Sequence, residues 1–102
     1  LHHDDRVAVM MVSQQTLREI GATPTDLEEV VNAPMSAAQV EVSILLTERE
    51  DGTTKASLRS KGHIDVAQLA AHFGGGGHTR AAGARLPLPP SRAAIALLDA
   101  LH

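Results

Sequence analysis

Residues 74–83 read Gly-Gly-Gly-Gly-His-Thr-Arg-Ala-Ala-Gly, and this stretch decides how the chain around it is interpreted. Four adjacent glycines cost folding entropy, because each loses more conformations than another residue would. Successive glycines also let several backbone N–H groups turn toward one anion, and no Cβ keeps a ligand away from the backbone. The Gly-Lys-Ser/Thr end of a P-loop is missing, since histidine follows the glycines. The stretch therefore predicts an anion-binding loop, with a flexible linker as the alternative.

Regular patterns lie on both sides of the glycine run. Before it, Asp65 is a helix N-cap, apolar residues recur at i, i+3, i+4 and i+7 from Val66, and Gly74 ends the helix. After it, residues 81–86 are typical of a strand, and prolines separate this strand from an amphipathic helix over residues 91–101. The glycine run is thus expected to connect a helix to a strand inside a packed domain.

The first third of the chain predicts one strand and two helices. Residues 7–12 read Val-Ala-Val-Met-Met-Val, a continuous apolar run typical of a central strand covered on both faces. Ser13 is the N-cap of a short helix that reaches about residue 20. Thr23 caps a second helix, which has proline at its first position and acidic residues that complement the helix dipole.

The middle of the chain predicts a β-hairpin. Residues 40–47 alternate between apolar and polar, as in a half-buried strand, an Asp-Gly pair at 51–52 favours a turn, and a second strand follows over residues 53–60. The complete order β-α-α-β-β-α-β-α predicts an α/β fold, a single small domain with a mixed β-sheet flanked by helices. A length of 102 residues and an apolar fraction of 43% fit one domain with a packed core.

Composition excludes several classes of protein. The absence of cysteine excludes a disulfide scaffold and a thiolate zinc site, and an aromatic fraction of 1% argues against aromatic base stacking. The longest apolar run is too short to span a bilayer, so no membrane partner is expected and the cytoplasm is the expected location.

Charge is distributed unevenly along the chain: residues 1–52 carry three basic and ten acidic side chains, whereas residues 53–85 carry five basic and one acidic. This segregation indicates a local anion site, or else a solvated face.

Cations of the predicted second hairpin strand share one face. Lys55, Ser57 and Arg59 alternate with apolar residues, and Lys61 extends their series. Three cations and a hydroxyl on one strand face predict an anion-binding surface. The alternative is a solvated outer face, which antiparallel sheets commonly have.

The glycine stretch adds two candidate binding side chains. His78 can donate a hydrogen bond to a phosphate, although a capping or packing role is the alternative, and Arg80 adds charge unless it is a surface residue. The histidines and aspartates at residues 2–5 are a weak metal site, because they lie at a free chain end without partner carboxylates. The sequence predicts no catalytic residue and no metal ligand in this chain.

Two segments together resemble a known family. Residues 57–62, Ser-Leu-Arg-Ser-Lys-Gly, and residues 73–83, Phe-Gly-Gly-Gly-Gly-His-Thr-Arg-Ala-Ala-Gly, are similar to the DHHA1 domain, and the helix that begins at Asp65 fits as well. The resemblance covers essentially the whole of residues 1–102. DHHA1 is the C-terminal domain of DHH-superfamily phosphoesterases, and the subfamily that this chain resembles is the bifunctional oligoribonuclease/PAP phosphatase, or nanoRNase, type.

The resemblance implies a substrate-binding domain. The catalytic DHH domain of such enzymes lies N-terminal, holds two Mn²⁺ or Mg²⁺ ions and is expected to be absent here, so the isolated domain is expected to be inactive and without a cofactor of its own. Expected partners are that domain and a short RNA, a nucleoside bisphosphate or a linear or cyclic dinucleotide, and the full-length protein is a possible homodimer. The resemblance also implies which residues bind the substrate. The substrate phosphate is expected to be held by Gly75, Gly76, Gly77 and His78. The other end of the nucleotide is expected to be held by Arg59 with Ser57 or Lys61, and Arg80 adds charge.

Two other functions remain open at this point. One is a RecJ-like exonuclease or a polyphosphatase-like enzyme, which would use the same loop on longer or simpler substrates. The other is a stand-alone nucleic-acid-binding module, like the C-terminal domain of alanyl-tRNA synthetase. Broad and strongly salt-dependent affinity for tRNA would favour the module.

Overall fold

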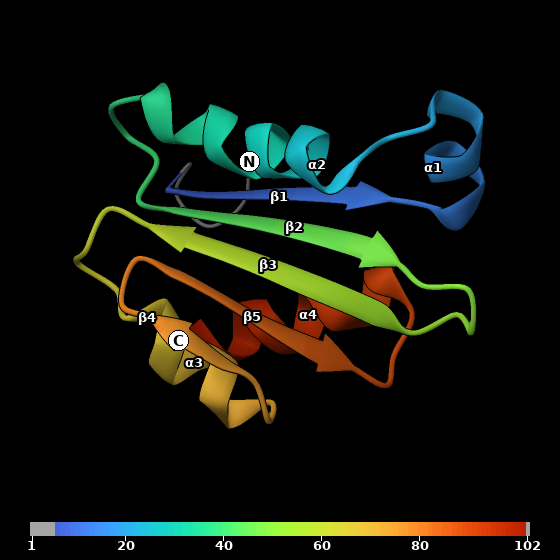
Figure 1. The fold of residues 1–102 in the computed structure, drawn as a ribbon. Coiled ribbons are helices and arrows are strands. Elements are labelled where there is room, and N and C mark those ends of the chain that lie inside the picture. Colours follow the sequence, from blue (N-terminus) through green and yellow to red (C-terminus); the bar gives the residue numbers. More distant parts are fainter. Residues whose placement is uncertain (1–5, 102) are drawn as a thin grey trace.

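One mixed sheet of five strands organises the chain, in a computed structural model that describes residues 6–101. The strands lie in the order β1-β2-β3-β5-β4 (Figure 1). Strand β1 is parallel to β2, and the other neighbours are antiparallel. The strands are β1 (Val7–Val12), β2 (Val42–Glu48), β3 (Thr54–Ser60), β4 (Gly76–His78) and β5 (Ala81–Leu86). The helices are α1 (Gln14–Ile20), α2 (Pro24–Asn32), α3 (Val66–His72) and α4 (Pro90–Leu101), with a 3₁₀ turn η1 (Ala33–Ser36).

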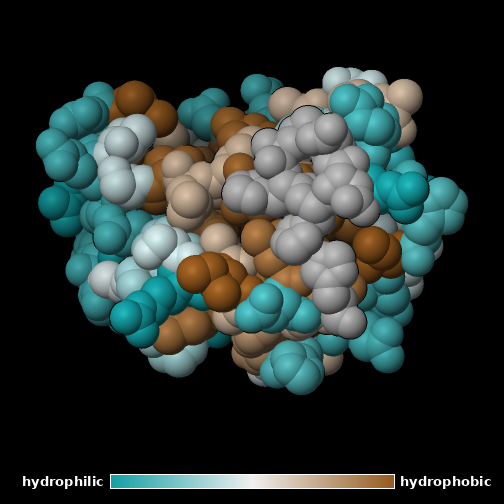
Figure 2. All heavy atoms as spheres, turned by 180° about the vertical axis from the view of Figure 1, so that it is seen from behind, coloured by the Kyte–Doolittle hydropathy of each residue, from teal (hydrophilic) through white to brown (hydrophobic). Residues whose placement is uncertain are grey.

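The hydrophobic core fills the space between one face of the sheet and helices α3 and α4. Ile44 of β2, Leu58 of β3 and Leu97 of α4 are completely buried there. Burial of each such side chain contributes about 1.5–3 kcal/mol to folding. Seen from behind (Figure 2), hydrophobic residues remain on the surface among polar ones, and Ile95 of α4 is 62% exposed. No helix within residues 6–101 has the length and apolarity that crossing a membrane requires.

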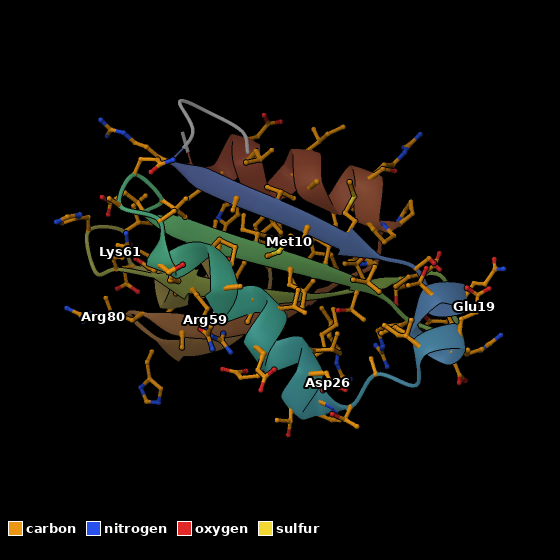
Figure 3. All side chains as sticks on the ribbon, turned by 90° about the horizontal axis from the view of Figure 1, so that it is seen from above. Met10, Glu19, Asp26, Arg59, Lys61 and Arg80 are labelled. Carbon is orange, nitrogen blue, oxygen red and sulfur yellow. The ribbon has the colours of Figure 1, made fainter. Side chains whose placement is uncertain are left out.

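The second face of the sheet is only partly covered. Helix α2 packs against β2 and β3, and Figure 3 shows it on the opposite side of the sheet from α4. Beyond α2, Lys55, His78 and Arg85 of β3, β4 and β5 are exposed. The fold therefore buries one face and leaves part of the other accessible, which confirms the predicted α/β domain with a mixed sheet flanked by helices.

The helix starts lie where the sequence predicts them. The Ser13 hydroxyl accepts the Thr16 N–H at 3.1 Å. Thr23 and Asp26 form a reciprocal capping box at the start of α2. Asp65 accepts two N–H groups of the first turn of α3. Each cap accepts hydrogen bonds from N–H groups that have no partner within the helix, which explains why these residues predict the helix starts correctly.

Two expectations about burial are wrong. Strand β1 lies at the edge of the sheet instead of its centre, and Met11 near its end is 54% exposed. Strand β2, expected to be half-buried, lies between β1 and β3 with helices on both faces, so its polar Ser43 and Thr47 are buried as well. Two elements, β4 and η1, have no counterpart among the predicted ones.

Candidate functional site

The sheet register brings Arg59 and His78 to one face. Arg59 of β3 lies opposite Ala81 of β5, and Ala81 lies opposite His78 of β4. Side chains directly opposite each other in a sheet point to the same side, and two strand spacings separate the Cα atoms of Arg59 and His78 by about 10 Å. These two residues lie 19 positions apart in the sequence, and pairing through β5 makes them neighbours across one row.

A second row on the same face is made of small residues. Ser57 lies opposite Gly83, and Gly83 lies opposite Gly76. Nothing larger than a serine side chain rises from this row, so the sheet backbone itself is accessible there. We call this surface the open face, and it consists of Lys55, Ser57, Arg59, Gly76, His78, Ala81, Gly83 and Arg85.

Arg59 is held in place by α2. Its Nη2 donates to both carboxylate oxygens of Glu28, at 2.7 and 2.6 Å, and its Nη1 donates to the Leu58 carbonyl at 2.9 Å. The guanidinium hydrogen bond lowers the pKa of Glu28, against a smaller opposing effect of burial. The Arg59 side chain is 16% exposed, and its Nε–H has no partner within residues 6–101. The arginine is thus oriented with part of its donor set available for a ligand.

Lys61 and Arg80 lie at the same end of the sheet as Arg59 (Figure 3). The Lys61 ammonium donates to the carbonyls of Ala37 and Ala38, at 2.7 and 3.3 Å, so it closes the loop after η1. Arg80 lies outside the strands and its guanidinium covers Gly62, where a Cβ would come within 3.0 Å of its Nε. The structure therefore brings Ser57, Arg59 and His78 onto one face and places the other two cations at its border.

The first two glycines of the run end α3, and their N–H groups do not contribute to the expected anion-binding nest. The Gly74 N–H donates to the Ala71 carbonyl at 3.0 Å, and the Gly75 N–H donates to the Ala70 carbonyl at 2.8 Å. With Gly74 at a φ of 80°, this pattern is a Schellman motif, which satisfies the last carbonyls of the helix. Of the three glycine amides predicted to bind the phosphate, that of Gly75 is therefore already occupied.

The remaining glycines allow β4 to lie against β5. A Cβ at Gly75 would stand 2.2 Å from the Gly83 oxygen, and a Cβ at Gly77 would stand 2.5 Å from the Ala82 Cα. A Cβ at Gly76 would meet nothing within 4 Å. Two glycines are thus required by packing. Because β4 is the last strand of the sheet, one side of its backbone has no neighbouring strand and can donate to a ligand.

The register also reveals a residue that sequence reasoning did not include in the site. Arg85 of β5 lies directly opposite Lys55 of β3, and both are exposed on the open face. The alternation of residues 81–86 already indicates that Arg85 points away from the core, but only the strand register shows that it lies opposite Lys55.

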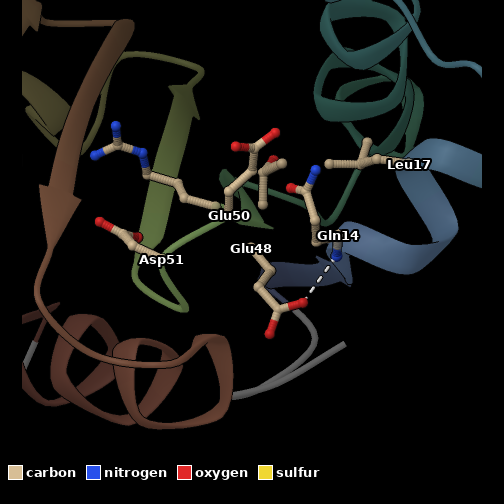
Figure 4. A pocket seen from close by; sticks show the side chains of 7 residues that line it. Gln14, Leu17, Glu48, Glu50 and Asp51 are labelled. Atoms are coloured by element: carbon tan, nitrogen blue, oxygen red, sulfur yellow. Dashed lines mark hydrogen bonds between the residues drawn. The ribbon is translucent and has the colours of Figure 1, made fainter.

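A larger hollow elsewhere is unsuited to an anion. It has a volume of about 530 Å³, lies at the turn between β2 and β3 and is lined by the carboxylates of Glu48, Glu50 and Asp51 together with the guanidinium of Arg49 (Figure 4). Glu48 accepts the Gln14 N–H there at 2.8 Å. Three carboxylates against one guanidinium leave this space with a net negative charge, which repels a phosphate.

Within residues 6–101 no group of three or more histidine, aspartate or glutamate side chains is arranged to hold a metal ion. The histidines and aspartates at residues 2–5, judged a weak metal site from the sequence, lie outside the described residues.

Alanine substitutions in the glycine run test the packing. Gly75→Ala and Gly77→Ala are expected to lower the free energy of unfolding by about 1–3 kcal/mol or more, because each new methyl group collides with β5. Gly76→Ala is the matched control, and we expect it to stay within about 0.5 kcal/mol of the wild type. Urea denaturation of the three variants measures the difference. Equal stabilities would contradict the close approach of β4 to β5.

The ion pair of Arg59 predicts a pH dependence of stability. Because Arg59 lowers the pKa of Glu28, the pair stabilises the fold above the usual glutamate pKa, and this contribution is lost as the pH falls through the lowered pKa. Glu28→Gln is therefore expected to lose less stability than the wild type between about pH 5 and pH 3, by no more than about 1 kcal/mol since Glu28 is exposed. Denaturation at a series of pH values measures this, with Glu29→Gln as the control. A Glu28 variant that follows the wild-type curve would show that the pair contributes nothing.

Comparison with known proteins identifies the family. Residues 4–102 match the family model of the DHHA1 domain. The probable bifunctional oligoribonuclease and PAP phosphatase NrnA of Streptococcus mutans is 31% identical over 77 residues, which make up 76% of this chain and 24% of that protein. An exopolyphosphatase-related protein from Bacteroides fragilis superposes with a TM-score of 0.88 and 30% identity, over 99% of this chain and 30% of that one.

A further likeness concerns the fold alone. The C-Ala domain of Aquifex aeolicus alanyl-tRNA synthetase has a TM-score of 0.64 at 14% identity, over 90% of this chain and 86% of that one. The chain spans 24% of the length of the Streptococcus relative. Since the family match extends over nearly all of the sequence, the chain belongs to the DHHA1 domain family.

Proposed function

We propose that this chain is the substrate-binding domain of a DHH-family phosphoesterase that hydrolyses short oligonucleotides or dinucleotides. The observation that carries the proposal is the row of Arg59, Ala81 and His78 across β3, β5 and β4. In this row the Cα atoms of the two candidate anion-binding residues, Arg59 and His78, lie about 10 Å apart on an accessible sheet surface. The relationship to a protein named as an oligoribonuclease and PAP phosphatase supports a phosphoester substrate.

Each part of the row has a chemical role in this proposal. Arg59, oriented by Glu28, binds one phosphate through its remaining N–H groups by charge-assisted hydrogen bonds. His78 donates from its ring to another oxygen, next to the free backbone side of β4. Ala81 between them and the row of small residues beside them leave room for a sugar or base to lie flat on the sheet. Binding of this kind positions the substrate without aromatic stacking.

The hydrolytic step belongs to another part of the enzyme in this proposal. A DHH domain with two Mn²⁺ or Mg²⁺ ions would supply the chemistry, and residues 6–101 contain no group of side chains that fits such ions. In this proposal the chain contributes binding and orientation. Polyphosphate is the second substrate to consider, because the Bacteroides neighbour is named as exopolyphosphatase-related and the same cations attract any chain of phosphates.

Titration of the chain with pApA, long single-stranded RNA and polyphosphate tests the proposal. We expect pApA to shift the NMR signals of residues 76–78 and Arg59, and Arg59→Ala to weaken this binding about tenfold or more, since a hydrogen bond to a charged group contributes about 1.5–3 kcal/mol. His78→Ala is expected to act in the same direction. The controls are Arg92→Ala on α4 and His72→Ala on α3, which are exposed residues outside the open face.

The three ligands separate the alternatives. Binding to long RNA without binding to pApA would contradict the proposal and favour a nucleic-acid-binding module. Binding to polyphosphate alone would favour a polyphosphatase.

In the full-length enzyme, Arg59→Ala and His78→Ala are expected to lower turnover by orders of magnitude with the metal content unchanged. Normal turnover in both variants would contradict the assignment of these residues to substrate binding.

A further inference from the structure

Two neighbouring cations of the sheet have no ion-pair partner among residues 6–101. Lys55 and Arg85 lie directly opposite each other on β3 and β5, and both are exposed. Neither has a carboxylate within 4.0 Å among residues 6–101, where the ion pairs are those of Arg59 and His63. Like charges directly opposite each other on neighbouring strands destabilise a sheet. A stability cost of this kind is expected where the two charges serve a ligand.

An acidic side chain that shares a hollow with Arg85 is engaged elsewhere. Asp51 lies with Arg85 around a shallow hollow, but its carboxylate accepts the Thr53 N–H at 3.0 Å and also the Thr53 hydroxyl. These hydrogen bonds lower the pKa of Asp51, so it stays ionised and engaged with its own turn. The guanidinium of Arg85 and the ammonium of Lys55 therefore remain available.

The cation pair borders a hollow in the sheet surface. Its volume is about 330 Å³, which exceeds the roughly 30 Å³ that one water molecule occupies in the liquid and leaves room for a phosphate group. Besides Lys55 and Arg85, its lining consists of Gly74, Gly75, Gly83 and Ala84. Small residues next to two cations form an anion-sized recess, in contrast to the acidic hollow at the turn between β2 and β3.

The distance between the Lys55–Arg85 pair and the row of Arg59 and His78 indicates how long a bound nucleotide chain would have to be. Lys55 precedes Arg59 by four residues on β3, which corresponds to about 13 Å along the strand. Successive nucleotides of a stacked strand advance by about 3.4 Å, so this distance matches about four nucleotide steps, and fewer if the strand is stretched. A dinucleotide anchored at Arg59 and His78 is too short to reach Lys55, whereas a chain of five nucleotides is long enough.

We propose that Lys55 and Arg85 form a second phosphate subsite, which binds the distal phosphates of an oligonucleotide whose first phosphates lie at Arg59 and His78. The proposal rests on the proposed function and extends it to substrate length. The domain then binds a five-nucleotide chain more tightly than a dinucleotide, and the difference depends on this pair of cations.

The experiment compares 5′-phosphorylated pentaadenylate with pApA on the same protein. The double variant Lys55→Gln/Arg85→Gln is expected to bind pentaadenylate about tenfold more weakly than the wild type and to bind pApA within twofold of it. The slope of log affinity against log salt for pentaadenylate is expected to fall by about 1.4, since about 0.7 counterions are released for each phosphate contacted on a single strand. The control Arg18→Gln/Arg92→Gln removes the same charge outside the open face and is expected to leave both affinities within twofold.

Folding of the double variant is checked independently. Because the substitution removes a like-charge contact between exposed side chains, the variant is expected to unfold at the same or a higher urea concentration than the wild type. A loss of pentaadenylate binding therefore reports on the ligand contact.

The outcomes separate this inference from the proposed function. If pApA binds and Arg59→Ala weakens it, but the double variant binds pentaadenylate like the wild type, the second subsite is wrong and the proposed function stands. An equal loss of pentaadenylate affinity in the double variant and in the charge control would also contradict the second subsite, since the loss would then reflect only the net charge of the protein. If the wild type binds neither oligonucleotide, the proposed function and the second subsite both fail.

Discussion

The docking of β4 on β5 depends on two positions where no Cβ is present. At Gly75 and Gly77 a methyl group would come closer to the backbone of β5 than atoms can approach, so only glycine lets the short strand lie there. The consequences extend across the sheet. Once β4 is in place, His78 lies opposite Ala81 and in one row with Arg59, and α3 ends in a Schellman motif directly before the strand. The spatial relation of the candidate binding residues thus follows from backbone packing.

The two faces of the sheet have different roles in this small domain. One face is apolar and is buried by α3 and α4, which provides the stability. The other face is covered by α2 only over β2 and part of β3, and its exposed remainder carries the cations. On this second face, the contact of Glu28 with Arg59 links the covered part to the exposed part, because the helix that packs on the sheet also orients a candidate ligand-binding side chain. An arginine that is already ordered loses less conformational entropy when a phosphate binds.

Local signals predicted much of the fold, and long-range pairing decided the rest. The caps at Ser13, Thr23 and Asp65 were predictable because a side chain and an N–H group two or three residues away determine them. The position of a strand within the sheet depends on partners far along the chain, which is why β1 was expected at the centre and β2 at a half-exposed position. Strand β4 was missed because its glycines carry no hydrophobic period and disfavour strands. Likewise Arg59 and His78 stand out in the sequence, whereas Arg85 becomes informative only through its register with Lys55.

The unequal surroundings of the glycines affect how related sequences are to be interpreted. Invariance at Gly75 and Gly77 would follow from steric exclusion in any member that keeps β4, whether or not it binds a phosphate. Gly76 is different, because the fold leaves space for a side chain at that position on the open face. If the proposed function holds, a family member that replaces this glycine can keep the fold and lose the ligand. Gly76 is therefore the position of the run at which the packing and the proposed function make different predictions about natural variation.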